Sequence, residues 1–109
     1  MLTREDVITK IQSFTNEITL GGLHLDRVIS FGSYAKNQQR EYSDIDVMLV
    51  SDMFIGIGFI DRKLFSKINI KKEFMDIETK TYPSKYFEQG DPFIDEILKT
   101  GIEVKTNIE

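Results

Sequence analysis

The stretch that decides the fold runs from residue 25 to residue 50 and reads LDRVISFGSYAKNQQREYSDIDVMLV. Both of its ends are rich in apolar and β-branched residues, so they predict one strand over residues 25–31 and a second over residues 45–50. The polar residues 33–43 between them predict a short helix followed by a loop. Two strands joined by so short a polar segment indicate a small sheet built around this part of the chain.

Functional residues are expected at the ends of these two strands. Gly32 ends the first strand, where the backbone must turn tightly and can let a ligand come close. A helical turn starting at Ser33 would offer free N–H groups to a phosphate. Asp44 and Asp46 lie two residues apart at the start of the second strand, so both carboxylates are expected on one face.

Two carboxylates held this close repel each other, and a cation between them would relieve the repulsion. Mg²⁺ prefers hard oxygen ligands and commonly joins one or two carboxylates to substrate phosphates. A third carboxylate from a neighbouring strand, either Asp76 or Glu78, would complete a site for two metal ions.

The remaining elements are predicted from capping residues, glycine stops and apolar spacing. Alternation over the third strand places Asp76, Glu78 and Lys80 on one face. The order of elements predicts an α/β (α+β) domain, with helices packed on a small sheet. The expected elements are helices over residues 3–20, 59–70 and 91–101, a strand over residues 74–82 and a short edge strand over residues 102–104.

Composition narrows the classes of function. The chain has 109 residues, a formal net charge of −4, no cysteine and one histidine, which excludes a disulfide scaffold and a cysteine- or histidine-rich metal site. Net acidity argues against a bare nucleic acid as partner. No apolar run approaches the length of a membrane span, and the first residues do not read as a signal peptide. We therefore expect one cytoplasmic domain that spans residues 1–109.

Two short motifs carry a family resemblance. Phe-Gly-Ser-Tyr-Ala at residues 31–35, followed by Tyr-Ser-Asp-Ile-Asp-Val at residues 42–47, closely resembles the signature of the DNA-polymerase-β-like nucleotidyltransferase superfamily. The most similar branch is the small minimal nucleotidyltransferase group. Residues 75–78 and 101–104 also look like that group, so the similarity extends over most of the chain.

The resemblance implies a nucleotidyltransferase that moves NMP, such as AMP from ATP, to an acceptor hydroxyl with loss of pyrophosphate. It also implies Mg²⁺ as the cofactor, as two ions. The family's third acidic residue matches Asp76 by strand position, with Glu78 as a rival on the same face. The implied roles are triphosphate binding for Gly32 and Ser33, and metal binding and catalysis for Asp44, Asp46 and this third carboxylate.

Some members of this branch are antitoxins that act beside a HEPN-type ribonuclease toxin. They transfer AMP to a toxin tyrosine or mask the toxin by binding it, which implies a protein partner in trans here. One alternative is a non-catalytic partner-binding module with the same fold. Another is a nucleotidyltransferase that acts on a small molecule or an RNA, with a second subunit of an oligomer completing its active-site cleft.

Two further segments allow two interpretations each. The apolar residues 54–59, FIGIGF, form either a lid over the core or a patch that binds a partner. The basic residues within 62–72 form either a solvated helix face or a guide for an acidic partner, a nucleotide or an RNA.

Overall fold

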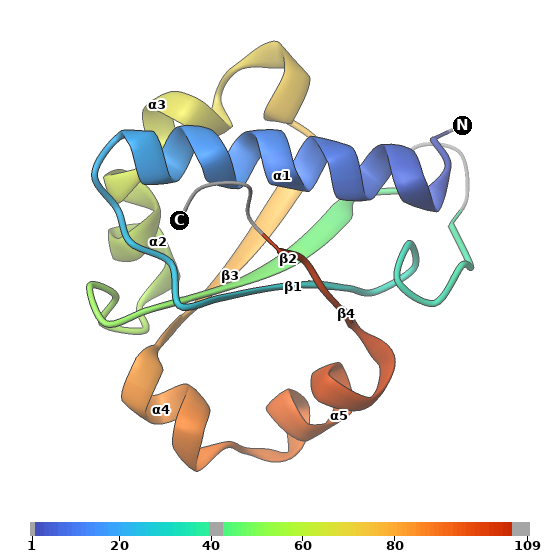
Figure 1. The fold of residues 1–109 in the computed structure, drawn as a ribbon. Helices are drawn as coiled ribbons and strands as arrows, with labels where there is room; N and C mark the ends of the chain where they lie inside the picture. The colour runs from blue at the N-terminus through green and yellow to red at the C-terminus, as the bar shows by residue number, and fades with distance from the viewer. Residues whose placement is uncertain (1, 40–42, 106–109) are drawn as a thin grey trace.

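A computed structural model describes residues 2–39 and 43–105 and shows a mixed four-stranded sheet (Figure 1). The strand order is β3-β2-β1-β4; β2 pairs parallel to β3, and β1 pairs antiparallel to both β2 and β4. This architecture confirms the α+β class expected from the sequence. The strands are β1 (Arg27–Phe31), β2 (Ile45–Ser51), β3 (Ile77–Pro83) and β4 (Ile102–Glu103).

Helices cover both faces of the sheet, which explains the apolar run in β2 (Figure 1). Helix α1 (Arg4–Leu20) packs on one face, where its Phe14 meets Phe65 and Phe74 edge-on or tilted. Helices α4 (Ser84–Gln89) and α5 (Pro92–Thr100) lie on the opposite face, over Met48 and Ile29. Successive residues of β2 therefore enter two separate cores.

The helix ends follow the sequence closely. Thr3 and Asp6 form the expected capping box at the start of α1. Asp91 caps α5 by accepting a hydrogen bond from the Ile94 N–H at 2.8 Å. Gly101 ends α5, where a Cβ would lie only 2.6 Å from the Ile97 carbonyl oxygen.

The prediction of one continuous helix over residues 59–70 was wrong. The structure divides this region into α2 (Gly58–Asp61), a 3₁₀ turn η1 (Arg62–Leu64) and α3 (Ser66–Asn69). Phe65 leaves helical geometry, with φ −137° and ψ 16°, because its ring is buried against Phe14 and Phe54. Burial of the Phe65 ring thus interrupts the continuous helix that apolar residues four positions apart had predicted.

Other segments also differ from expectation. Residues 33–37 form a turn and not a helix. The third strand begins at Ile77, because the preceding Lys72–Phe74 forms a 3₁₀ turn, η2. Helix α4 was not expected from the sequence.

No helix in the described ranges has the length and hydrophobicity that crossing a membrane requires.

Asp61 holds the loop after β2 in place. This buried carboxylate accepts hydrogen bonds from the N–H groups of Ile55 and Gly56, both at 2.9 Å, and from the Thr81 hydroxyl at 2.8 Å. It therefore ties the loop and α2 to strand β3.

An Asp61→Ala variant is expected to lose roughly 3 kcal/mol of unfolding free energy, because three donors would lose a charged partner. Urea unfolding measures this loss. Asp52→Ala, at an exposed neighbouring position, should change stability by less than about 0.5 kcal/mol. Equal stability of the two variants would contradict the role of Asp61.

Candidate active site

The loop after β1 brings the backbone against a carboxylate. Gly32 has φ +77°, and a Cβ built there would lie 2.2 Å from Oδ2 of Asp46. The two residues meet because Phe31 pairs with Asp46 across the antiparallel β1–β2 ladder. Glycine is required here both by the left-handed conformation and by the close approach of the carboxylate.

Ser33 follows in a compact turn. The Lys36 N–H donates to the Gly32 carbonyl at 3.1 Å, and the Gln38 N–H donates to the Ser33 carbonyl at 2.7 Å. The expected helix dipole is therefore absent at this position. Binding of a triphosphate by Gly32 and Ser33 stays a prediction, and Arg40 and Tyr42 of the same segment lie outside the described residues.

Asp46 lies next to Glu78 because β2 and β3 are parallel and these two residues are partners in the register. Burial raises the pKa of Asp46, and the negative charges of Glu78 and Asp44 raise it further. Asp44 is exposed and lies directly before β2. The charges of Glu78 and Asp44 thus both act on Asp46 at the start of β2.

Asp76 is placed differently. It lies just before β3, and its carboxylate accepts hydrogen bonds from Lys10 Nζ of α1 at 3.0 and 3.2 Å. Helix α1 packs on the face of the sheet opposite α4 and α5 (Figure 1). The structure therefore brings Glu78 beside Asp46 and pairs Asp76 with Lys10, while a metal-binding role for Asp76 stays a prediction.

The carboxylates fit a divalent cation by their chemistry. They are hard oxygen donors, and burial together with the negative charges of Glu78 and Asp44 raises the pKa of Asp46, a cost that a bound cation would offset. Within the described ranges, no three His, Cys, Asp or Glu side chains are gathered closely enough to form a ready metal site. Binding would therefore require side-chain rotation of the exposed Asp44 and Glu78 toward Asp46.

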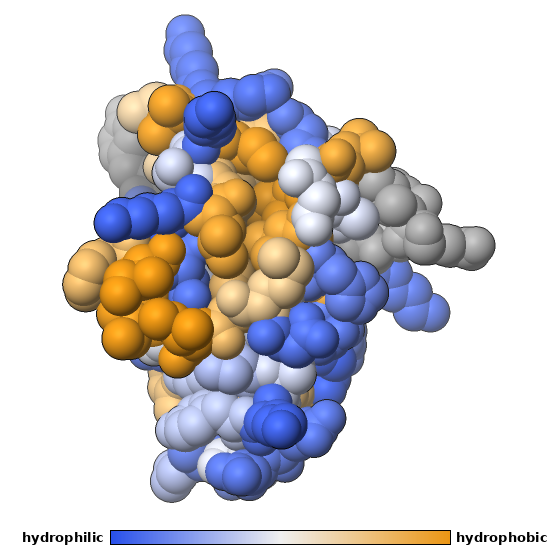
Figure 2. All heavy atoms as spheres, turned by 90° about the vertical axis from the view of Figure 1, so that its left-hand side faces the viewer, coloured by the Kyte–Doolittle hydropathy of each residue, from blue (hydrophilic) through white to orange (hydrophobic). Residues whose placement is uncertain are grey.

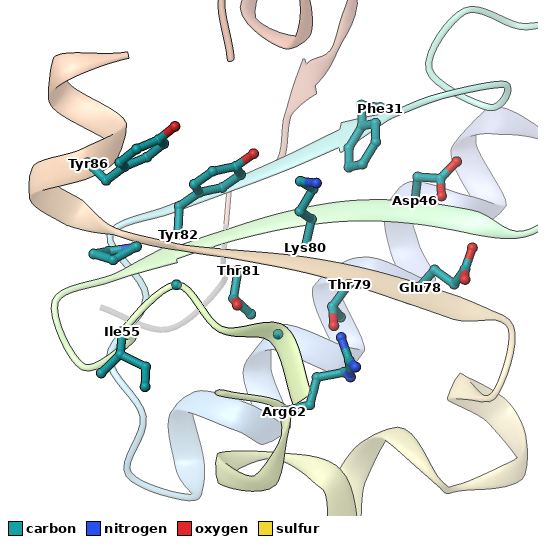
Figure 3. A pocket seen from close by; sticks show the side chains of 13 residues that line it. Phe31, Asp46, Ile55, Arg62, Glu78, Thr79, Lys80, Thr81, Tyr82 and Tyr86 are labelled. Atoms are coloured by element: carbon teal, nitrogen blue, oxygen red, sulfur yellow. The ribbon is translucent and has the colours of Figure 1, made fainter. Parts of the chain in front are cut away.

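A pocket of about 690 Å³ extends from these carboxylates along β3 (Figure 3). Asp46 and Glu78 lie at one end, Lys80 lies between the ends, and Tyr82 with Tyr86 lies at the other end. Gly32, Ser33 and Asp44 do not line it. The remaining lining residues are Phe31, Ile55, Gly56, Gly58, Arg62, Thr79, Thr81 and Pro83.

The sequence placed Lys80 on the face of Glu78 and offered the basic residues within 62–72 as one possible guide for a nucleotide, but it assigned neither Lys80 nor Arg62 to the site and gave no role to the two tyrosines. The Lys80 ammonium lies over the Phe93 ring at 4.8 Å from its centroid, and the Tyr82 and Tyr86 rings stack at 5.4 Å. The face that Lys80 shares with Glu78 was the signal that could have assigned Lys80 to the site. Nothing local in the sequence could have placed Arg62 across the pocket.

An Asp46→Asn variant is expected to be more stable than the wild type at about pH 7 without metal. The folded-state pKa of Asp46 is above the ordinary value of 3.8, so the ionised carboxylate costs stability once the pH exceeds the folded pKa. The advantage of the variant should shrink as the pH falls toward 3.8 and Asp46 becomes protonated. Urea unfolding in EDTA across this range measures it, and a larger advantage at acid pH would contradict the assignment.

Comparison with known proteins identifies the family and similar folds. Residues 10–109 match the family described as polymerase beta, nucleotidyltransferase. No curated protein matches the chain. The fold is similar to a candidate nucleotidyltransferase from Sulfolobus solfataricus, with a TM-score of 0.67 and 17% identity over 95% of this chain and 84% of that chain.

A second solved structure has a similar fold. It is a chain of a toxin–antitoxin complex with AMP-PNP, with a TM-score of 0.57 and 14% identity over 88% of this chain and 73% of that chain. At these identities the two structures support the fold alone. Since the family match covers nearly the whole chain, this protein belongs to the polymerase beta nucleotidyltransferase family.

Proposed function

We propose that this protein is a Mg²⁺-dependent nucleotidyltransferase that transfers AMP from ATP to a hydroxyl on a macromolecule supplied in trans. The observation that carries this proposal is the approach of Asp46 to both Glu78 and the Gly32 turn. Neighbouring carboxylates beside a glycine turn could hold a cation and a triphosphate side by side. Family membership supports the same reaction class.

Each residue has a distinct role in this proposal. Asp44 and Asp46 would hold Mg²⁺, which when bound neutralises charge on the phosphates and orients them. Gly32 and Ser33 would hold the triphosphate through the N–H groups of the turn. Glu78 is favoured over Asp76 as the third carboxylate, because it lies beside Asp46 whereas Asp76 is paired with Lys10.

The reaction forms a bond from the acceptor oxygen to the α-phosphorus and breaks the bond to the bridging oxygen of the leaving pyrophosphate. The acceptor proton would pass to an ionised carboxylate, and Glu78 is exposed to an incoming hydroxyl. Most of the rate enhancement would come from positioning and charge stabilisation.

A protein acceptor is favoured by the solved toxin–antitoxin structure with AMP-PNP, in which a chain of similar fold occurs. We propose a HEPN-type toxin as partner and one of its tyrosines as the acceptor, which would make this chain an antitoxin. The cysteine-free sequence is compatible with the cytoplasm as its location.

The proposal is tested by mixing the purified chain with a HEPN-type protein encoded next to it, ATP and Mg²⁺. The expected result is a mass gain of one AMP unit on the partner, which EDTA abolishes. A complex that forms without a mass change, with any of the four nucleotides, would favour the non-catalytic binding module instead.

A further inference from the structure

We propose that an exposed apolar patch on the loop after β2, on α2 and on η1 docks a partner protein through a helix that carries apolar residues flanked by Asp and Glu. That this partner is the acceptor rests on the proposed function, whereas the docking surface itself does not. The side chains of this 53–64 patch are Met53, Ile55, Ile57, Phe59, Ile60 and Leu64.

Exposed apolar surface is concentrated in this one segment. Half of the twelve large hydrophobic side chains that are exposed in the described ranges belong to the 53–64 patch. Phe59 is 66% exposed and Ile55 is 59% exposed. Figure 2 faces the side of the molecule on which the loop and α2 lie, and it shows apolar atoms gathered there. Contiguous apolar surface of this kind marks an interaction site on a folded domain.

The patch has a fixed frame beneath it. Phe54 lies between exposed patch residues in the sequence, yet its ring is buried and packs against Phe65 at 6.2 Å between centroids. The buried Asp61 carboxylate holds the N–H groups of Ile55 and Gly56. Of the two interpretations of residues 54–59, a cover over the core therefore applies to Phe54, and an exposed surface applies to the patch residues. An ordered surface loses less conformational entropy on binding than a flexible one.

Basic side chains accompany the patch on η1 and α3. Residues 52–72 contain five Lys and Arg and two Asp, a net charge of +3 in a chain whose net charge is −4. Arg62, Lys63 and Lys67 are exposed, and among the described residues none of the three has a carboxylate at ion-pair distance. Acidic side chains of a partner would complement them. An apolar stripe flanked by acidic residues is the pattern of an amphipathic helix.

The same charges disfavour two other occupants. A second copy of this chain, docked through the same patch about a two-fold axis, would bring the basic side chains of both copies together. An anionic membrane would attract residues 52–72 but repel the remainder of the chain, which is acidic. An acidic helix of a different protein meets neither obstacle.

The patch adjoins the pocket. Ile55 belongs to the patch and also lines the pocket, and so does Arg62, which lies between two patch residues in the sequence (Figure 3). Asp46 and Glu78 line the same pocket at one end. A partner docked on the patch would therefore lie beside the pocket in which the proposed transfer takes place.

The test uses a display library of helical peptides that share a constant leucine stripe and have flanking positions randomised among Glu, Lys and Ser. The peptides are selected on the intact protein without ATP or Mg²⁺. Phe59→Ser removes a large apolar side chain from the patch. The double variant Lys63→Glu with Lys67→Glu reverses the charge beside it.

Matched controls are available on α4 and α5. Leu98→Ser removes an apolar side chain that is 48% exposed. The double variant Lys85→Glu with Lys99→Glu makes the same change of charge at two exposed positions. Circular dichroism checks that all variants are folded.

We expect Glu-flanked helices to be enriched, and to bind wild type and both controls within about two-fold. Phe59→Ser should weaken binding at least about ten-fold, since a central aromatic side chain carries much of the energy of an interface. The Lys63→Glu and Lys67→Glu variant should weaken Glu-flanked helices by a similar factor and bind Lys-flanked helices more tightly than wild type does.

Enrichment of no helix, or only of Lys- or Ser-flanked helices, would overturn the inference. Binding that Leu98→Ser weakens as strongly as Phe59→Ser would also overturn it. Sedimentation of the protein with phosphatidylglycerol vesicles, if Phe59→Ser abolished it, would assign the patch to a lipid surface instead.

AMP transfer to the HEPN-type partner separates this inference from the proposed function. Phe59→Ser should raise the KM for that partner about ten-fold and leave kcat unchanged, because Phe59 does not line the pocket. An unchanged KM would show that the acceptor docks elsewhere and would overturn the link between patch and acceptor. Helices that bind the patch, together with no AMP transfer to the partner, would support the docking surface and contradict the proposed function.

Discussion

Asp46→Asn is expected to reduce AMP transfer by at least about 100-fold, because Asp46 is the half-buried carboxylate on which the proposed metal site is centred. The amide keeps the size of the side chain and removes its charge. Without metal the variant should be folded and slightly more stable than wild type, since a part-buried charge and its repulsion from Glu78 and Asp44 both disappear. A loss of transfer therefore could not be attributed to unfolding.

The measurement is incorporation of labelled AMP into the partner at saturating Mg²⁺. Asp52→Asn, an exposed aspartate outside the pocket, is the matched control and should retain full activity. Full activity of Asp46→Asn would make the site assignment wrong.

The same assay separates the two candidates for the third carboxylate. Glu78→Gln should lose activity nearly as strongly as Asp46→Asn, because Glu78 lies opposite Asp46 in the ladder. Asp76→Asn should retain most activity and weaken only the part-buried ion pair with Lys10, which is worth about 1 kcal/mol. The reverse ranking would show that Asp76 reaches the metal during the reaction.

Gly32→Ala is expected to reduce transfer by about 100-fold, because the new Cβ would lie 2.2 Å from the Asp46 carboxylate and would displace either the turn or the carboxylate. The positive φ of 77° adds about 1–2 kcal/mol of backbone strain for any side chain. We expect Gly32→Ala to reduce both AMP transfer and the thermal stabilisation that Mg²⁺ produces, since the Asp46 carboxylate is proposed to take part in both.

Gly22→Ala provides the matched control. Gly22 also has a positive φ, 103°, but a Cβ there would meet no atom within 4 Å. This variant should show a similar loss of unfolding free energy and normal transfer. If both variants were equally active, the close approach of Gly32 to Asp46 would have no functional meaning.

Elements defined by local rules were predicted well from the sequence. The capping box of Thr3 and Asp6 and the cap at Asp91 depend on residues three positions apart, so they are readable without the fold. The helix expected over residues 59–70 was not predicted correctly, because Phe65 gains more from burial against Phe14 than from helical geometry. Apolar spacing cannot report which ring finds space in the core.

The sequence by itself determined the family resemblance, the glycine after the first strand and the paired Asp44 and Asp46, because all of these depend on spacing along the chain. Only the tertiary structure decided that Glu78 lies beside Asp46, that Asp76 pairs with Lys10, and that residues of β3 line a pocket. The physical reason is register: alternation tells which face a side chain takes, but packing between distant segments sets which residue stands opposite it.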